Sequence, residues 1–241
     1  MIFNDYLYYY KTGKEVVNPL RVFVTDKEFI KFYVRAIIGE KYNVPTIAVL
    51  RSPVEAANYY YPINCCIKPT HLSGEVIFRR GGEPIDFKKI HRWFFTSYYR
   101  RKREANYKTL KPKAIIEPII FNNTNLNDYK FYCYRGEPKL IQVDMDRHIQ
   151  HKMKFYDTYW QEMPFSIRHP KFEGIIPKPK NLDTMLEIAR ELSKYFEFIR
   201  VDLYTNDIEI LVGELTNCPG NISGVFIPYG SEDEASKIIF G

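Results

Sequence analysis

The stretch from residue 198 to residue 220 constrains the fold more than any other part of the sequence. Its apolar alternation predicts two strands, Phe198–Tyr204 and Ile208–Thr216, joined by a short polar turn at residues 205–207. On the first strand Arg200 and Asp202 alternate with apolar residues, so both project from the same face. A proline and a glycine at positions 219 and 220 end the second strand. The sequence therefore predicts an antiparallel hairpin with charged residues on one face.

The second strand carries Glu214, and its position relative to Asp202 depends on the pairing register. The two side chains share a face only if paired residue numbers sum to an even value, which requires a turn of odd length or a β-bulge. Two carboxylates would then meet the Arg200 guanidinium, an arrangement that suits a hard cation such as Mg2+. Without the ion the carboxylates would repel each other, so their neutralisation should leave the fold stable. The alternative is a surface hairpin with a solvated charged face.

Length and composition indicate a soluble globular protein with one large domain or two small ones. The chain has 241 residues, of which 45% are hydrophobic and 27% charged. No apolar run reaches the roughly 20 residues of a membrane span, and the start lacks a signal-peptide hydrophobic region. The four cysteines (Cys65, Cys66, Cys133 and Cys218) show no Cys-x-x-Cys spacing. We therefore expect a cytoplasmic, reduced setting without a zinc site or a transmembrane segment.

Several function classes lack their usual motifs. There is no Gly-x-Ser-x-Gly, His-Glu-x-x-His or Walker lysine loop, which removes the main support for hydrolase, zincin and P-loop functions. The net charge of +6 fits a nucleotide, an acidic glycan or nucleic acid without choosing among them. The basic, aromatic segment 91–113 is compatible with a helix that binds nucleic acid or a membrane surface. We favour a buried stripe of Ile90, Phe94 and Tyr98 with a solvated basic side, and expect no nucleic-acid partner.

The rest of the chain predicts alternating helices and strands first and mainly strands later. The expected elements are an irregular segment 1–24 ending in a strand Leu20–Val24, a helix from Thr25 or Asp26 to about Glu40, a strand Val44–Leu50, a short helix after Ser52 to Tyr59, strands Asn64–Lys68 and Glu75–Arg80, a long helix Asp86–Asn106, a strand Ala114–Ile120, an antiparallel meander of Tyr129–Tyr134, Leu140–Asp146 and Met153–Tyr156, a loop over 170–180, a helix Asn181–Phe196 and a helix beginning near Asp233. This is an α+β pattern, compatible with two lobes that clasp a nucleotide.

The hairpin motif resembles the metal-binding end of ATP-grasp ligases. It has Arg-x-Asp on one strand and Glu-x-x-x-x-Pro-Gly at the end of the next, an order that D-alanine–D-alanine ligases share. Other stretches resemble the TupA-like branch, which is associated with teichuronopeptide and other surface-polysaccharide biosynthesis. They keep the family order from about Thr25 to Gly224: Thr25-Asp26-Lys27, the segment 66–74, Ile116-Glu117-Pro118, the segment 128–131, the segment 141–147, the segment 200–204 and the segment 213–216.

The resemblance implies an ATP-grasp fold of two α+β lobes with a reduced N-terminal pre-domain. Residues 1–43 would form the N-terminal segment and first helix, residues 44–113 the small lobe, and residues 114–241 the large lobe with the metal site. The implied function is an ATP- and Mg2+-dependent carboxylate–amine ligase that forms an amide through an acyl phosphate and releases ADP. Its substrates would be a uronic acid of a surface polysaccharide, or of its precursor, and an amino acid or amino alcohol.

The same resemblance implies peripheral association with a polysaccharide assembly machinery. It leaves open two other functions on the same fold. One is a kinase-like phosphotransferase, and the other is a binding module for a nucleotide or glycan that performs no catalysis.

Candidate nucleotide-binding residues follow from the resemblance. Lys68, beside the turn that follows its strand, and Lys27 would hold phosphates, with Lys31 as an alternative to Lys27. Leu72 stands where the family's phosphate loop has a glycine. The remaining candidates are Glu117, Pro118 and Ile119 for adenine, and Asp128 and Lys130 for ribose or phosphate.

The resemblance also assigns metal ligands and catalytic residues. Asp202 and Glu214 would hold Mg2+ together with Thr216 or Asn217, a choice that the sequence leaves open. Arg200 would steady the acyl phosphate, beside Lys68 on the phosphates. Arg147 would orient the acceptor substrate within a mixed cluster of Asp144, Asp146, Lys152 and Lys154.

Overall fold

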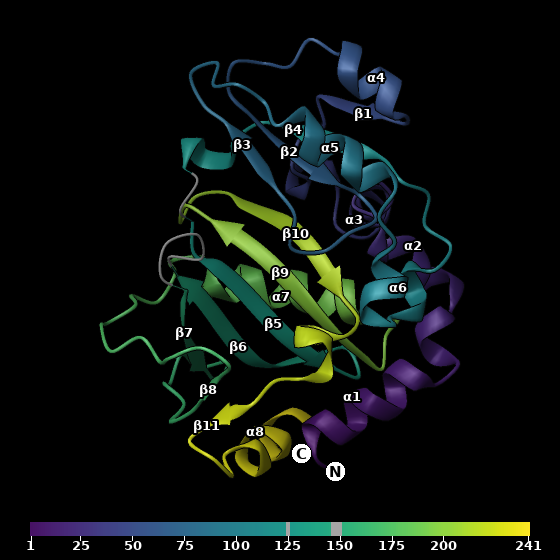
Figure 1. Ribbon diagram of the computed structural model, residues 1–241. Helices are drawn as coiled ribbons and strands as arrows, with labels where there is room; N and C mark the ends of the chain where they lie inside the picture. Colours follow the sequence, from purple (N-terminus) through teal and green to yellow (C-terminus); the bar gives the residue numbers. More distant parts are fainter. Residues whose placement is uncertain (124–125, 146–150) are drawn as a thin grey trace. The chain divides into compact units, whose positions relative to one another are not determined.

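The computed structural model describes residues 1–123, 126–145 and 151–241. The chain divides into two compact units, each assembled from segments that are far apart in the sequence. The first unit comprises Met1–Gly13, Val34–Asn43 and Asn125–Gly241, and the second comprises Lys14–Tyr33 and Val44–Thr124. Figure 1 shows the helices and strands of both units.

The first unit is built on an antiparallel sheet of five strands in the order β10-β9-β5-β6-β7. The strands are β5 (Asp128–Tyr134), β6 (Glu137–Met145), β7 (Lys152–Tyr156), β9 (Phe198–Thr205) and β10 (Ile210–Thr216). The predicted meander of β5, β6 and β7 is confirmed. The hairpin of β9 and β10 is confirmed as well, and β9 pairs with β5 so that the hairpin extends the meander.

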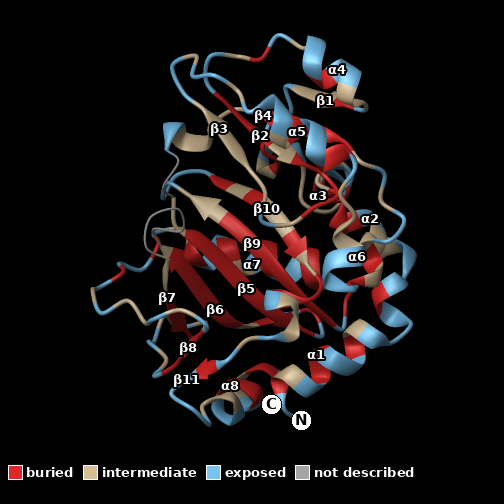
Figure 2. Cartoon of the chain, viewed as in Figure 1, coloured by how far each residue is buried: buried red, intermediate tan, exposed pale blue. Residues whose placement is uncertain are grey.

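Alternation along the strands gives this sheet one apolar and one polar face. Phe131, Ile141 and Val201 are fully buried on the apolar face, where α7 (Leu182–Ser193) contacts β5, β6 and β9. The predicted stripe of α7 is buried as well, with Met185, Ala189 and Leu192 fully enclosed. In Figure 2 the central strands are coloured as buried along most of their length. The polar face of the same strands therefore holds its charged residues out of water.

Two terminal helices complete the first unit. In α1 (Phe3–Thr12), Phe3 and Tyr6 make edge-on ring contacts with Phe198 of β9. The helix α8 (Glu232–Phe240) contacts α1, β5 and β6. This unit also contains a small sheet of β8 (Ser166–Ile167) and β11 (Phe226–Ile227), and the 3₁₀ helices η2 (Glu40–Tyr42) and η5 (Pro219–Ile222).

The second unit contains an antiparallel sheet of four strands in the order β1-β4-β2-β3. The strands are β1 (Ala48–Leu50), β2 (Cys65–Pro69), β3 (Ile77–Arg79) and β4 (Ala114–Glu117). Its helices are α2 (Pro19–Thr25), α4 (Pro53–Asn58), α5 (Phe87–Phe94) and α6 (Tyr98–Lys102), with 3₁₀ helices η1 (Glu15–Val17), η3 (Ala105–Tyr107) and η4 (Ile120–Asn122). The helix α3 (Ile30–Ile37) begins in this unit and ends in the other.

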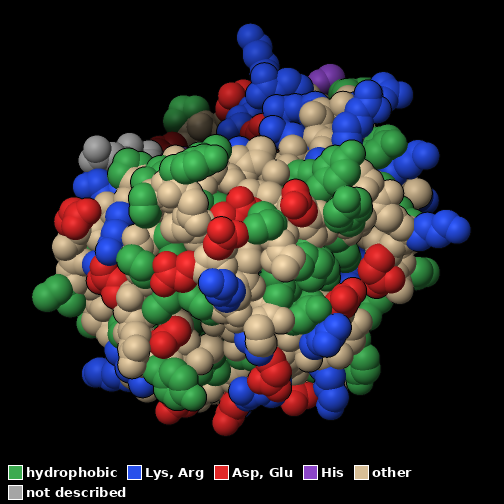
Figure 3. All heavy atoms as spheres, turned by 90° about the horizontal axis from the view of Figure 1, so that it is seen from below, with side chains coloured by type: hydrophobic (Ala, Val, Ile, Leu, Met, Phe, Trp, Pro, Cys, Tyr) green, Lys and Arg blue, Asp and Glu red, His purple; other side chains and the backbone are tan. Residues whose placement is uncertain are grey.

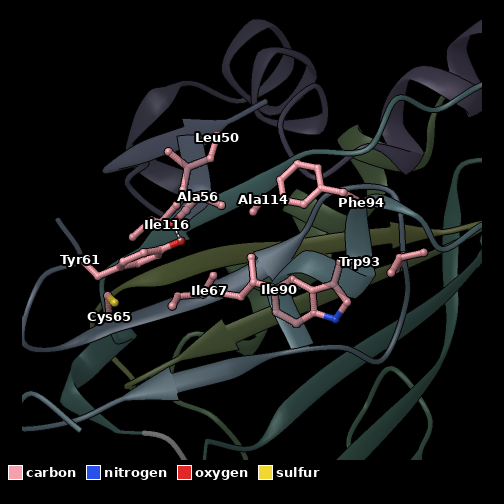
Figure 4. Packing of buried hydrophobic residues seen from close by; sticks show 11 residues of the cluster. Leu50, Ala56, Tyr61, Cys65, Ile67, Ile90, Trp93, Phe94, Ala114 and Ile116 are labelled. Carbon is pink, nitrogen blue, oxygen red and sulfur yellow. Dashed lines mark hydrogen bonds between the residues drawn. The ribbon is translucent and has the colours of Figure 1, made fainter. Parts of the chain in front are cut away.

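The core of the second unit joins the inner face of α5 to the sheet. Ile90 and Trp93 of α5 lie with Ile67 of β2 and Ile116 of β4 in one buried cluster (Figure 4). As the sequence predicts, Ser52 caps α4 by accepting a hydrogen bond from the Glu55 amide, and Pro53 occupies the first helical position.

Three predicted elements are wrong. Residues 1–24 form helices instead of an irregular segment and the strand Leu20–Val24. Asn18 caps α2, and Pro19 has the backbone φ that a helix start requires. The predicted helix Asp86–Asn106 is broken between α5 and α6, where Ser97 accepts a hydrogen bond from the Arg100 amide and starts a new helix. The strand predicted to reach Ile120 ends at Glu117, because Pro118 has no N–H for the ladder.

Candidate functional site

The register of β9 and β10 changes at a β-bulge. Ile210 lies opposite Thr205 and Val212 opposite Leu203, whereas Glu214 lies opposite Asp202. The turn between the strands spans residues 206–209, so the turn alone would leave Asp202 and Glu214 on different faces. The bulge between Val212 and Glu214 supplies the extra residue. The sequence required either an odd turn or a bulge for Asp202 and Glu214 to share a face. The structure has the bulge, and its turn has an even number of residues.

Gly213 is the residue that this bulge accommodates. A Cβ atom at this position would lie 2.8 Å from Cε2 of Tyr204 and 3.4 Å from the carbonyl oxygen of Asp202. A side chain would therefore press on the strand that carries Asp202. A glycine inside an apolar strand is a sequence signal for a bulge, and here it marks the position that turns Glu214 toward Asp202.

Lys130 lies at the centre of the polar face of the five-stranded sheet. Its Nζ is 2.8 Å from Oδ2 of Asp128, 3.2 Å from Oδ2 of Asp144 and 3.8 Å from Oδ2 of Asp202. All four residues are buried. Burial opposes the charged form of Lys130, but the surrounding aspartates outweigh it and raise its pKa above the ordinary value. The expected shared face of Asp128 and Lys130 is confirmed.

Arg200 connects Asp202 to the second strand of the hairpin. Its Nε and Nη2 donate to Oδ1 and Oδ2 of Asp202 at 2.7 and 2.6 Å, and Nη2 also donates to Oγ1 of Thr216 at 3.0 Å. The same Nη2 lies 3.5 Å from Oε1 of Glu214. Burial raises the pKa of Asp202 to about 6, although Arg200 and Lys130 act in the opposite direction. The predicted convergence of the two carboxylates with the Arg200 guanidinium is confirmed, because Arg200 contacts both.

The charges of this polar face favour a cation. The cluster contains two more acidic than basic side chains. The acids are Asp128, Asp144, Asp202 and Glu214, and the bases are Lys130 and Arg200. Carboxylates with hydroxyl or amide oxygens are ligands that Mg2+ prefers. Among the described residues no group of three or more His, Cys, Asp and Glu is arranged to hold a metal ion. The ligands expected from the sequence are the carboxylates of Asp202 and Glu214 and one neutral oxygen.

The two candidates for a neutral ligand differ in their surroundings. Thr216 is on the polar face, and its Oγ1 donates to Oε1 of Glu214 at 3.2 Å. Asn217 is buried just beyond the end of β10, where its Oδ1 accepts a hydrogen bond of 3.0 Å from the hydroxyl of Tyr10. Thr216 therefore already contacts a carboxylate of the cluster.

Sequence reasoning missed the polar residues that hold Asp144. Nε2 of Gln142 donates to Oδ1 of Asp144 at 2.5 Å, and the hydroxyl of Tyr132 donates to Oε1 of Gln142 at 2.6 Å. Nε2 of His151 lies 3.4 Å from Oδ2 of Asp144. Burial alone would raise the pKa of Asp144, but Lys130, His151 and Gln142 hold it below the ordinary value. The period-two alternation through Tyr132 and Gln142 was the available signal.

The expected mixed cluster around Asp144 is wrong in part. Lys154 pairs with Val143 and Lys152 with Met145, so both lysines project from the face opposite to Asp144. Nζ of Lys154 instead contacts Oε2 of Glu162 at 2.7 Å and the carbonyl oxygen of Gly174 at 2.8 Å. Asp146 and Arg147, the other expected members, lie outside the described residues.

In the second unit, Glu117 brings two lysines together. Its Oε1 is 2.6 Å from Nζ of Lys31, and its Oε2 is 2.9 Å from Nζ of Lys68. Cys66 lies opposite Glu117 in the ladder of β2 and β4, so Lys68, two residues further on, projects from the same face. Burial alone would raise the pKa of Glu117, but Lys68 and Lys31 lower it below 4.5. The three side chains carry one more positive charge than negative, which suits an anion.

Lys27 and Leu72 hold the turn that follows β2. Nζ of Lys27 donates to the carbonyl oxygen of Leu72 at 2.6 Å, and its amide donates to that of Thr70 at 3.2 Å. The Leu72 side chain is buried in the core of the unit. The leucine in place of the expected glycine therefore anchors this turn by packing. Pro118 and Ile119 follow directly after β4 and are half-buried.

Comparison with known proteins identifies the family. The chain belongs to the TupA-like ATP-grasp family, whose sequence model matches residues 10–235, nearly the whole chain. This assigns the ATP-grasp fold to the α+β architecture described above. No curated protein matches the sequence.

Solved structures of ATP-grasp ligases show weak likeness to the chain. The D-alanine–D-alanine ligase of Helicobacter pylori aligns with a TM-score of 0.48 and 13% identity over 91% of this chain and 55% of that one. The ligase of Bacillus anthracis complexed with ATP gives 0.44 and 14% over 82% and 55%. The D-cycloserine synthetase DcsG gives 0.47 and 14% over 91% and 72%. The chain spans about half the length of the two D-alanine–D-alanine ligases.

Proposed function

We propose that the protein is an ATP- and Mg2+-dependent carboxylate–amine ligase that forms an amide bond and releases ADP. The observation that carries the proposal is the bulge at Gly213, which places Glu214 opposite Asp202 beside Arg200 in a member of the TupA-like ATP-grasp family. A bulge that re-aims one carboxylate toward another is typical of a functional site.

The residues of the polar face fit a magnesium ion. Asp202 and Glu214 would hold the ion, and Thr216 or Asn217 would supply a neutral oxygen ligand. The excess of carboxylates over basic groups on this face would favour binding of the cation. Bound Mg2+ would neutralise the charge of the ATP phosphates. Since Arg200 already bonds both oxygens of Asp202, the arginine would share this carboxylate with the ion.

The lysines of the second unit would bind the phosphates of ATP. Lys68 and Lys31 are held side by side by Glu117, and Lys27 lies at the turn after β2. Because the Glu117 side chain is engaged with the lysines, the segment Glu117, Pro118 and Ile119 would bind adenine through its backbone. In the first unit, Asp128 and Lys130 would act on the ribose or a phosphate.

The reaction needs charge neutralisation more than a strong base. An oxygen of the substrate carboxylate would attack the γ-phosphorus, ADP would leave, and an acyl phosphate would form. The amine would then attack the acyl carbon, phosphate would leave, and the nitrogen would lose a proton. Arg200 would stabilise the negative charge on the acyl phosphate, and Arg147 would orient the acceptor.

The substrate class follows from the family alone. We propose a uronic acid of a surface polysaccharide, or of its precursor, joined to an amino acid or amino alcohol in the cytoplasm. A peripheral place beside a polysaccharide assembly machinery belongs to the same proposal.

Nucleotide binding can be tested before any substrate is known. Mg2+-ATP at about 100 times its dissociation constant should add about 2.7 kcal/mol to the free energy of unfolding, a visible rise in Tm. A screen of uronic acids against amines, followed by ADP release and product mass, then tests the reaction. An unchanged Tm with millimolar Mg2+-ATP would contradict the proposal, and a stable phosphoester product would favour a kinase-like activity instead.

A further inference from the structure

The outer face of α5 exposes aromatic side chains among its basic ones. Ile90, Trp93 and Phe94 bury its inner face in the core of the second unit (Figure 4). Phe87, His91 and Phe95 follow one another at four-residue spacing on the other side, and all three are exposed. Phe95 is 73% exposed, and its ring lies 4.9 Å from that of His91. The helix therefore presents an aromatic stripe to solvent in addition to the one that it buries.

Basic side chains flank this stripe, and the only exposed acid of α5 and its caps is Asp86, at the N-cap. Lys88 and Arg92 are exposed beside it on α5, and Arg100, Arg101 and Lys102 are exposed on α6, which begins three residues after Phe95. Glu104 is the one acid between positions 87 and 112 in the sequence, and it is only 3% exposed. By contrast, acidic and basic side chains are interspersed over the middle of the face shown in Figure 3. The segment 87–102 is thus a strongly cationic and aromatic surface.

Exposed aliphatic side chains are present on α4 and on the segment that follows it in the chain. The helix α4 contacts α5, and its Val54 is 69% exposed. Ile63, in the segment between α4 and β2, is 60% exposed. Aromatic rings alone could stack on the bases of a nucleic acid, but Val54 and Ile63 have no such use. Mixed aliphatic and aromatic side chains next to lysine and arginine suit the interface between headgroups and acyl chains.

We propose that the outer surface of α4, α5 and α6, carried by Val54, Phe87, Phe95, Arg92 and the run Arg100–Lys102, docks on a membrane rich in anionic phospholipid. The basic residues are attracted to the headgroups, and the exposed apolar side chains enter the interface. Among the described residues no helix is long and apolar enough to cross a membrane. The inferred contact is peripheral and reversible, and it does not depend on the proposed ligase activity.

Sedimentation with vesicles tests this surface directly. The full chain should bind phosphatidylcholine vesicles that contain about one third phosphatidylglycerol, and should bind pure phosphatidylcholine weakly. The triple variant Arg100→Glu, Arg101→Glu and Lys102→Glu should lower partitioning roughly 100-fold, since each basic residue near the surface contributes about fivefold. Phe95→Ser should lower it about tenfold. Raising the salt concentration should weaken binding of the wild type.

A matched control separates the surface from net charge. Lys178→Glu, Lys180→Glu and Lys194→Glu change the same number of exposed basic residues in the first unit and should leave binding within about twofold of the wild type's. Unchanged melting of all variants shows that they are folded. The proposal is overturned if both triple variants bind alike, if phosphatidylglycerol makes no difference, or if single-stranded RNA competes the protein off the vesicles and binds it more tightly.

Discussion

Replacing Glu117 by glutamine should destabilise the second unit, because this one carboxylate holds two lysines. Its Oε1 and Oε2 contact Lys31 and Lys68 at 2.6 and 2.9 Å, and its side chain is 6% exposed. The substitution keeps the shape of the side chain and removes its charge. Lys31 and Lys68 would then repel each other across a neutral amide.

The size of the effect follows from burial. Removing one partner of a buried ion pair costs about 3–5 kcal/mol, because the remaining charge is left uncompensated. Here the lysine side chains keep 17% and 27% exposure, so water offsets part of that cost. We expect the free energy of unfolding to fall by about 2–3 kcal/mol. For a chain of this size, this corresponds to a fall in Tm of roughly 4–12 °C.

Thermal melts of four variants (Glu117→Gln, Glu83→Gln, Lys31→Met and the double variant of positions 31 and 117) at several pH values make the assay specific. Glu83→Gln changes an exposed glutamate of the same unit and should shift stability by less than about 0.5 kcal/mol. Lys31→Met combined with Glu117→Gln should cost less than the sum of the two single changes. The lowered pKa of Glu117 means that its contribution is present above pH 4.5 and is lost as the pH falls through the folded-state value.

This explanation would be refuted if Glu117→Gln had the same Tm as Glu83→Gln and the wild type at neutral pH. It would also fail if the difference between Glu117→Gln and the wild type grew in acid, because the wild-type carboxylate is then protonated. Additive effects of Lys31→Met and Glu117→Gln would mean that the two side chains do not interact.

Three further predictions concern the polar face of the five-stranded sheet. Asp202→Asn and Glu214→Gln should each change the free energy of unfolding by less than about 1 kcal/mol, because acids still outnumber bases there, yet slow ADP release roughly 100–1000-fold. Near-normal ADP release by the double variant would instead favour a solvated hairpin face. The effect of Mg2+ on Tm should strengthen as the pH rises through about 6, since the ion and a proton compete for Asp202; a response independent of pH would argue against this ligand. Gly213→Val should lower the free energy of unfolding by about 1–3 kcal/mol and abolish the Mg2+ response, because its Cβ would lie 2.8 Å from Tyr204. Adding Tyr204→Ala should recover part of the stability in a thermal melt. Full stability of Gly213→Val alone would show that the bulge tolerates a side chain.

Alternation in the sequence predicts the sheet that carries the candidate metal ligands. Period-two patterns place Asp128 with Lys130 and Arg200 with Asp202, and each pair shares a face in the structure. The condition for Glu214 to join Asp202 was also accessible, because it depends only on parity. Parity alone does not distinguish a bulge from an odd turn, and Gly213 was the one local signal for the bulge.

The sequence predicts less well where tertiary packing overrides local preference. The helix α1 contains four tyrosines and one phenylalanine, which have low helix propensity, but it buries Phe3, Tyr6 and Tyr10 against its own unit. The contact of Lys31 with Glu117 joins residues far apart in the chain. The ladder of β2 and β4 and the position of α3 create it, and neither leaves a local pattern in the sequence.

Oxygen transfer from the substrate carboxylate to phosphate tests the proposed ligase chemistry most directly. Uronic acids labelled with ¹⁸O in the carboxyl group would be incubated with Mg2+-ATP, a panel of amines and the purified protein. An acyl phosphate intermediate predicts that the released phosphate carries one labelled oxygen, that the nucleotide product is ADP, and that the organic product is an amide. Unlabelled phosphate, or AMP with pyrophosphate, would contradict the proposed ligase and the role of Arg200.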